Sequence, residues 1–168
     1  VQSGMLASRD PPHGLDEGVP GSSLGGEDAS SFRREPVDAP PALVYEAMTR
    51  PEHIRQWWGC LGDGYSVPVC EVDLRVGGKW KFVNRHPKGE ATFYGEYLEL
   101  DPPRRVVFTE IFADFPDSPS TVTSELVPEG AKTRLIAVVR YPSKDVRDMV
   151  IATGMSNGAG ISYDRLDD

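Results

Sequence analysis

The chain has 168 residues, a length that suits one globular domain and leaves little room for a second. It is 39% hydrophobic and 26% charged, and no stretch approaches the roughly 20 apolar residues that a membrane-spanning helix needs. Its formal net charge of -8 argues against a nucleic-acid partner, because affinity for phosphate backbones comes from Lys and Arg.

Residues 1–30 are rich in Gly, Ser, Pro and acidic side chains, with too few apolar residues to offset the entropy of ordering a backbone. We predict a flexible leader here and a single folded domain over residues 31–168. The first residues lack the cationic start, apolar run and cleavage site of a secretory signal, so the cytoplasm is the expected compartment. Cys60 and Cys70 are then expected to be reduced thiols.

The folded domain is predicted to begin with a short strand within residues 31–37, followed by two short helices. The segment DAPPALVYEAMTR, residues 38–50, has Asp38 as a candidate cap and prolines in the first turn, where a missing N–H costs nothing. Pro51 ends this helix, and PEHIRQWW, residues 51–58, predicts the second.

The hydrophobic period then changes to two, and turn residues recur at the intervals typical of an antiparallel sheet. The predicted strands span residues 67–74, 79–85, 91–100, 104–113, 120–127 and 132–141. With the first short run, about seven strands are expected, joined mostly by hairpins. In KWKFVNR, Trp80, Phe82 and Asn84 alternate to one face of the sheet.

Residues 142–168 predict one long C-terminal helix, with Ser143 as its N-cap and Asp145 in its first turn. Thr153 and Asn157 lie on its small, polar stripe, among glycines that each cost about 1 kcal/mol against Ala. The glycines indicate either a close approach of the backbone to the sheet or a ligand, or a helix that bends or ends early near Asn157.

These elements together predict an α+β helix-grip fold, in which a curved antiparallel sheet surrounds the long C-terminal helix. A strongly coiled sheet touches a single helix along a line, so a cavity is expected between them. Cavities of this kind often bind apolar small molecules.

Five segments, in order and spacing, resemble the homologues of the activator of the heat-shock protein 90 ATPase, within the START-like (SRPBCC) superfamily of polyketide cyclases and lipid-transfer proteins. They are VDAPPALVYEAMTRPEHIRQWWG, VCEVDLRVGGKWKFV, GEYLELDPPRRVVFT, KTRLIAVVRYPS and MVIATGMSNGAGISYDRLDD, and the resemblance covers residues 32–168. It implies a helix-grip fold with a hydrophobic cavity. Members of the superfamily cyclise polyketides, carry lipids, sequester toxic metabolites or assist a chaperone, so the fold does not imply one reaction.

One segment of this chain departs from the family. Relatives usually have a bulky aromatic residue or a charged pair in the final helix, where this chain has SNGAGIS. Against the family pattern, the loss of side-chain volume implies either a larger cavity or a weaker helix.

The candidate ligand-binding residues are aromatic and polar side chains on alternate strand positions, on the second short helix and on the final helix. They are Trp57, Trp58, Trp80, Phe82, Asn84, Tyr94, Phe108, Glu110, Phe112, Thr153 and Asn157. For the aromatic residues, packing in the core is the alternative interpretation, because cavity walls and cores use the same residue types. Glu110 is also the candidate catalytic residue, since a buried carboxyl with a raised pKa can act as a general acid or base; a solvated strand glutamate is the alternative.

Other kinds of site find no support in the sequence. The histidines and cysteines of the domain are not paired at the spacing of two to four residues that zinc sites show, so no metal is expected. RVGGKW links two strands and opens no helix, which excludes a dinucleotide fingerprint, and we expect no cofactor. The sequence therefore favours binding of a hydrophobic small molecule, with a chaperone-type protein partner or a cyclase-type enzyme as alternatives.

Overall fold

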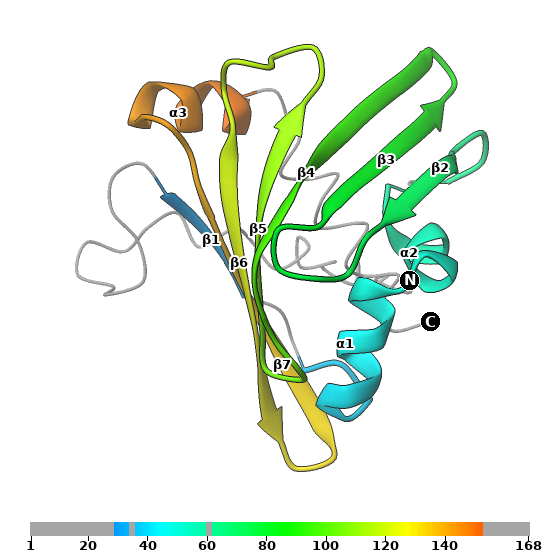
Figure 1. Ribbon diagram of the computed structural model, residues 1–168, viewed down its shortest axis with the longest axis vertical. Coiled ribbons are helices and arrows are strands. Elements are labelled where there is room, and N and C mark those ends of the chain that lie inside the picture. Colours follow the sequence, from blue (N-terminus) through cyan, green and yellow to red (C-terminus); the bar gives the residue numbers. More distant parts are fainter. Residues whose placement is uncertain (1–28, 34–35, 60–61, 153–168) are drawn as a thin grey trace, which may run out of the picture.

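The computed structural model describes residues 29–33, 36–59 and 62–152. In chain order the described elements are β1 (Ala29–Arg33), α1 (Pro41–Thr49), α2 (Pro51–Trp57), β2 (Ser66–Val72), β3 (Lys79–His86), β4 (Gly89–Asp101), β5 (Arg105–Phe112), β6 (Ser120–Glu129), β7 (Lys132–Arg140) and α3 (Lys144–Ala152). Their strands form one antiparallel sheet in the order β1-β7-β6-β5-β4-β3-β2. The predicted α+β fold with a curved antiparallel sheet is confirmed (Figure 1).

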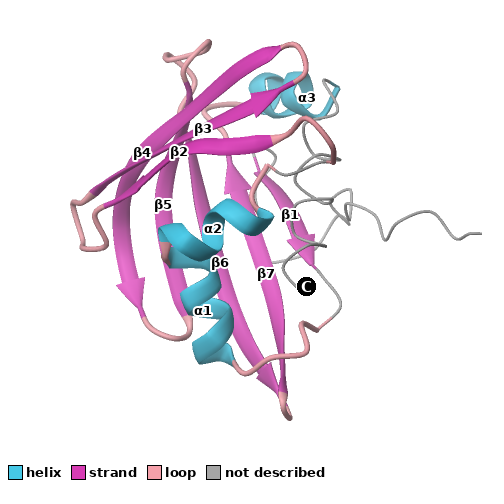
Figure 2. Ribbon diagram, turned by 90° about the vertical axis from the view of Figure 1, so that its right-hand side faces the viewer, coloured by secondary structure: helices cyan, strands magenta, loops and turns pink. Residues whose placement is uncertain are grey.

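Each strand from β2 to β7 pairs with the next in the chain, and β1 returns to pair with β7. Helices α1 and α2 lie against one face of this sheet (Figure 2). We call it the inner face, and the opposite one the outer face. The core lies between these helices and the inner face, and its most buried side chains are Val44, Ile54, Leu135, Thr133 and Ser124.

The start of α1 differs from the prediction in one respect. Asp38 does not cap the helix: the N-cap is Pro40, which makes no side-chain capping bond. Pro40 has an extended backbone with φ -68°, and Pro41 follows at the first helical position. Proline has no side-chain acceptor and Asp38 stands two residues before the N-cap, so the helix begins without a side-chain cap.

The described C-terminal helix is α3 (Lys144–Ala152), which covers nine residues of the predicted helix over residues 142–168; the predicted length of that helix is not confirmed. The Val146 amide donates to Ser143 Oγ over 3.2 Å, and Asp145 stands in the first turn, which confirms the predicted N-cap. Residues 153–168, with the predicted ligand residues Thr153 and Asn157, lie outside the described part of the chain. No helix within the described residues has the length and apolar character needed to cross a membrane.

Candidate functional site

Aromatic side chains from four elements meet on the inner face. Directly opposite residues of an antiparallel pair share a face, and the register sets Phe82 opposite Phe93 and Phe93 opposite Phe112. Trp58, at the end of α2, contacts Phe82 and Phe93 edge-on, with ring centroids 5.0 and 5.3 Å apart. Phe93 stacks on Phe112 at 5.0 Å, and Phe112 contacts Phe115 at 5.8 Å. We call Trp58, Phe82, Phe93, Phe112 and Phe115 the aromatic cluster.

The aromatic cluster differs from core packing in its exposure. Phe82 is buried, but Trp58, Phe93 and Phe112 are half-buried, and Phe115 is 55% exposed. Half-buried aromatic rings that pack against a core on one side and stay accessible on the other are a residue type from which ligand sites are often built. The cluster therefore offers flat apolar surface to a bound molecule.

Deeper rings connect the aromatic cluster to the core. Trp80 lies 4.7 Å from Phe82 and 5.6 Å from Phe108, and Tyr97 lies 6.2 Å from Phe108, all measured between ring centroids. Trp80 and Tyr97 are buried, whereas Phe108 is half-buried. Trp80 and Phe82 share a face as the alternation predicts, and the register places Phe108 and Phe112 on that same face.

Between β4 and β5 the backbone ladder is interrupted. The indole N–H of Trp80 donates to the carbonyl of Thr109 over 3.1 Å, and the Glu96 amide donates to the Thr109 hydroxyl over 3.0 Å. Gly95 lies directly opposite Trp80, and a Cβ there would overlap the Thr109 carbonyl oxygen. The Trp80 indole thus crosses Gly95 to reach β5. This crossing requires glycine at position 95, because any side chain there would occupy the same space.

Glu110 lies at this interruption. The register on either side, Tyr94 opposite Ile111 and Tyr97 opposite Phe108, puts Glu110 opposite Gly95 on the inner face. Burial raises the pKa of its carboxyl from 4.5 to about 7, although part of the residue remains accessible. A carboxyl with this pKa can accept or donate a proton near neutral pH, as a general acid or base must.

The two adjacent tryptophans have different surroundings. Trp57 is buried, and its indole N–H donates to the Ala47 carbonyl of α1 over 2.8 Å, so it packs between the two helices. Trp58 turns to the sheet and joins the aromatic cluster. Of the two interpretations that the sequence left open for this pair, packing fits Trp57 and a ligand-facing position fits Trp58.

Asn84 lies on the inner face as the alternation predicts, but its amide group is already engaged. Its Nδ2 donates to the carbonyl of Gly59 over 2.8 Å and, more weakly, to that of Ser66 over 3.4 Å. Gly59 has φ +63°, and a Cβ at that position would meet the Asn84 amide. Asn84 therefore fixes the chain that leaves α2, which leaves its amide nitrogen little capacity for a ligand.

Tyr94 is not where the alternation was expected to place it. It lies opposite Lys81 on the outer face, so its predicted convergence with the other aromatic residues is wrong. Phe93 takes that place, and the sequence analysis missed it. The signal was present: Phe93, Gly95 and Tyr97 alternate with Tyr94 and the charged Glu96.

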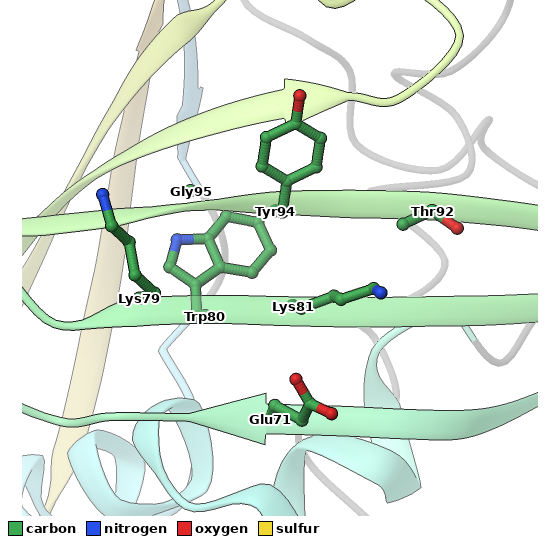
Figure 3. A pocket seen from close by; sticks show the side chains of 7 residues that line it. All are labelled: Glu71, Lys79, Trp80, Lys81, Thr92, Tyr94 and Gly95. Carbon is green, nitrogen blue, oxygen red and sulfur yellow. The ribbon is translucent and has the colours of Figure 1, made fainter.

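An open pocket of about 430 Å³ lies on this outer face (Figure 3). Its lining residues are Glu71, Lys79, Trp80, Lys81, Thr92, Tyr94 and Gly95. Lys79 already pairs with Glu96 over 2.9 Å, and carboxylates and ammonium groups alternate across the pocket. Charged side chains surround this open pocket, whereas five aromatic rings contact one another in the aromatic cluster, which we therefore regard as the better candidate site for an apolar molecule.

The described part of the chain contains no group of three or more His, Cys, Asp or Glu arranged to hold a metal ion. Cys70 is a free, buried thiol on β2, and burial raises its pKa, with a smaller opposing effect from Arg55. A buried thiol of raised pKa is a poor nucleophile.

Comparison with known proteins places this site in a family. The model of the activator of Hsp90 ATPase homolog 1-like proteins matches residues 38–168, which include every described element after β1. The chain belongs to this family. Its predicted relationship to the START-like superfamily is thereby confirmed. No curated protein matches the chain.

Solved structures of bacterial proteins share the fold of this chain. A crystal structure of a Rhodobacter sphaeroides protein is 26% identical, with a TM-score of 0.76, over 85% of this chain and 92% of that one. A Nitrosomonas europaea protein is also 26% identical, with a TM-score of 0.74, over 86% and 94% of the two chains. An AHSA1-like protein from Aeromonas hydrophila, 18% identical over 83% and 89% with a TM-score of 0.64, shares the fold alone.

Proposed function

We propose that this protein binds an apolar small molecule on the inner face of its sheet, against the aromatic cluster. The observation that carries the proposal is the half-buried state of Trp58, Phe93 and Phe112, whose rings contact one another yet remain accessible. A ligand that covers these rings removes their apolar surface from water, which contributes about 25 cal/mol of binding free energy per Å² buried. Membership of a family with ligand-binding and interaction modules supports the same function.

Naphthalenemethanol, a neutral aromatic probe, tests this proposal by NMR titration of the ¹⁵N-labelled protein. The largest shifts are expected at the Trp58 indole and at the amides of Phe93 and Phe112. Phe112→Ala should weaken binding about ten-fold, because an aromatic contact is worth about 1 kcal/mol beyond its buried area. Tyr94→Ala, on the outer face, should leave the affinity unchanged.

Two results would overturn the proposal. If Tyr94→Ala weakens binding and Phe112→Ala does not, the probe occupies the outer pocket of Figure 3. If the wild-type spectrum does not change at millimolar probe, the inner face binds no aromatic molecule of this size. The dispersion of amide signals reports whether each variant is folded.

A protein partner is the second candidate function, and a group of exposed apolar side chains favours it. Leu74 and Val76 are 44% and 64% exposed in the β2–β3 turn, and Leu98 on β4 is 45% exposed. The Gly77 amide donates to the Tyr97 carbonyl over 2.8 Å, which brings this turn against β4 near Leu98. Grouped exposed apolar side chains often mark interaction surfaces.

The family description makes an Hsp90 ATPase the partner to test. If the chain acts as such an activator, adding it should raise the rate of ATP hydrolysis by Hsp90. Leu98→Asp should remove the increase, because a charge at an apolar interface must be desolvated. Leu43→Asp is the control, since Leu43 is 56% exposed on α1 and does not belong to this group. An unchanged ATPase rate with the wild-type chain would rule this function out.

A further inference from the structure

Glu110 is unusual among the charged residues of the sheet. Of the described inner-face positions of β3 to β6, it alone carries a carboxyl. The other charges of these strands point outward, where they pair with one another: Lys79 with Glu96, and Arg105 with Glu125. Within the described chain, no cation and no hydrogen-bond donor reaches the Glu110 carboxyl.

The neighbours of Glu110 on the inner face are apolar or uncharged. Phe108 and Phe112 stand on either side of it along β5, Gly95 lies opposite on β4, and Ser120 lies opposite on β6. The Ser120 hydroxyl donates to the backbone carbonyl of Glu110 over 3.3 Å rather than to its carboxylate. Burial without a partner explains the raised pKa of this group.

The other titratable groups on this face do not compensate its charge. The Tyr97 phenol and the Cys70 thiol have no cationic form, and because burial raises the pKa of each, both stay neutral near neutral pH. His86 stands at the far end of β3, where its Nδ1 accepts from the Lys88 amide and its ring faces Tyr65. The counter-charge for an ionised Glu110 must therefore come from outside the described residues.

We propose that Glu110 anchors an organic cation, a ligand whose ammonium group meets the carboxylate while its apolar body lies on the aromatic cluster. This inference rests on the proposed function and names the class of its ligand. Three observations support it: the unpaired carboxyl, the aromatic faces around it, which attract cations, and the formal net charge of -8, which draws cations to the protein.

The anchor also determines what the site rejects. Placing a ligand carboxylate or phosphate beside an ionised, poorly solvated Glu110 brings together like charges in a medium of low dielectric. Below its pKa the carboxyl becomes neutral and loses its attraction for a cation. A preference for ammonium over neutral ligands should therefore fall as the pH is lowered through about 7.

A matched pair of probes tests the anchor: 2-naphthylmethylammonium and the isosteric neutral alcohol, 2-naphthalenemethanol, titrated calorimetrically into the full chain. At about pH 8 the ammonium should bind about ten-fold more tightly than the alcohol, the gain typical of one charge-assisted hydrogen bond. Glu110→Gln should abolish this preference, so that the two probes bind with affinities within about two-fold of each other. Glu96→Gln, which removes an outer-face carboxylate of β4, should retain it.

The outcomes separate this inference from the proposed function. Equal affinities of the wild type for the two probes would overturn the anchor while leaving the aromatic site in place. An ammonium preference that survives Glu110→Gln would assign the attraction to another group and equally overturn it. If neither probe binds, the proposed function fails and the anchor with it. Binding of the alcohol by Glu110→Gln shows that this variant is folded.

Discussion

Replacement of Gly95 with Ala is expected to lower the free energy of unfolding by about 3 kcal/mol or more. The new methyl group would overlap the Thr109 carbonyl oxygen and come within 2.9 Å of the Trp80 indole nitrogen. Neither atom can withdraw freely, because the two are hydrogen-bonded to each other over 3.1 Å. The substitution must separate β4 from β5 or displace a buried indole. Urea unfolding monitored by tryptophan fluorescence measures the loss.

Gly130→Ala is the control for this experiment. Gly130 has φ +63° in the β6–β7 turn, and a Cβ there meets no atom within 4 Å. Alanine at this position carries only the strain of a left-handed backbone, about 1 kcal/mol. If Gly95→Ala cost no more than this control, the close approach of Trp80 to β5 would not constrain the sheet.

Replacement of Glu110 with Gln is expected to stabilise the protein at high pH. A carboxyl pKa raised from 4.5 to about 7 penalises the ionised form, and we expect about 2 to 3 kcal/mol for a residue that keeps some contact with water. Gln keeps the shape of the side chain and carries no charge. The variant should therefore unfold at a higher temperature than the wild type at about pH 8.

The pH dependence distinguishes this effect from a simple gain in packing. Because folding raises the pKa of Glu110, the wild type pays no penalty below about pH 4.5, and the penalty grows as the pH rises to about 7 and is then constant. The difference between Glu110→Gln and the wild type should therefore vanish near pH 4.5 and be greatest above about 7. A difference that did not vary with pH would show that Glu110 titrates normally. Calorimetric melting curves at several pH values decide this.

The sequence predicts the hairpins of the sheet well because their two signals are local. Turn residues such as those of HPKG and PEGA interrupt an alternation that each strand carries by itself. The N-cap at Ser143 is equally local, since a hydroxyl need only reach an amide three residues ahead. Asp38 failed as a cap because it stands two residues before the N-cap position, which Pro40 occupies.

The error at Tyr94 has a physical reason within β4. The register shifts by one residue between Tyr97 and Glu99, so the alternation changes phase there. Leu100 lies opposite Val106 and faces inward. If the strand alternated without a bulge, Tyr94, six residues earlier, would face inward as well. The sequence carries both alternations, one through Phe93 and Tyr97 and one through Tyr94 and Leu100, and the pairing with β5 shows that the first holds before the bulge.

The residues that surround Glu110 are likewise determined by how β5 pairs with β4 and β6. Alternation places it with Phe108 and Phe112, as the sequence predicts, but does not show what stands across from it. The absence of a cation opposite and the empty position at Gly95 depend on the exact registers of β5 with β4 and with β6. The raised pKa of this carboxyl therefore required the assembled sheet.

The bond from Asn84 to Gly59 allows the site to be reshaped from a distance. Gly59 directly follows Trp58, so Asn84 Nδ2 secures the peptide that carries one wall of the aromatic cluster. A relative with a different residue at this position of β3 would hold that indole at another angle without any change among the ligand-facing side chains. Relatives with this fold could therefore differ in ligand selectivity because of a residue that does not contact the ligand.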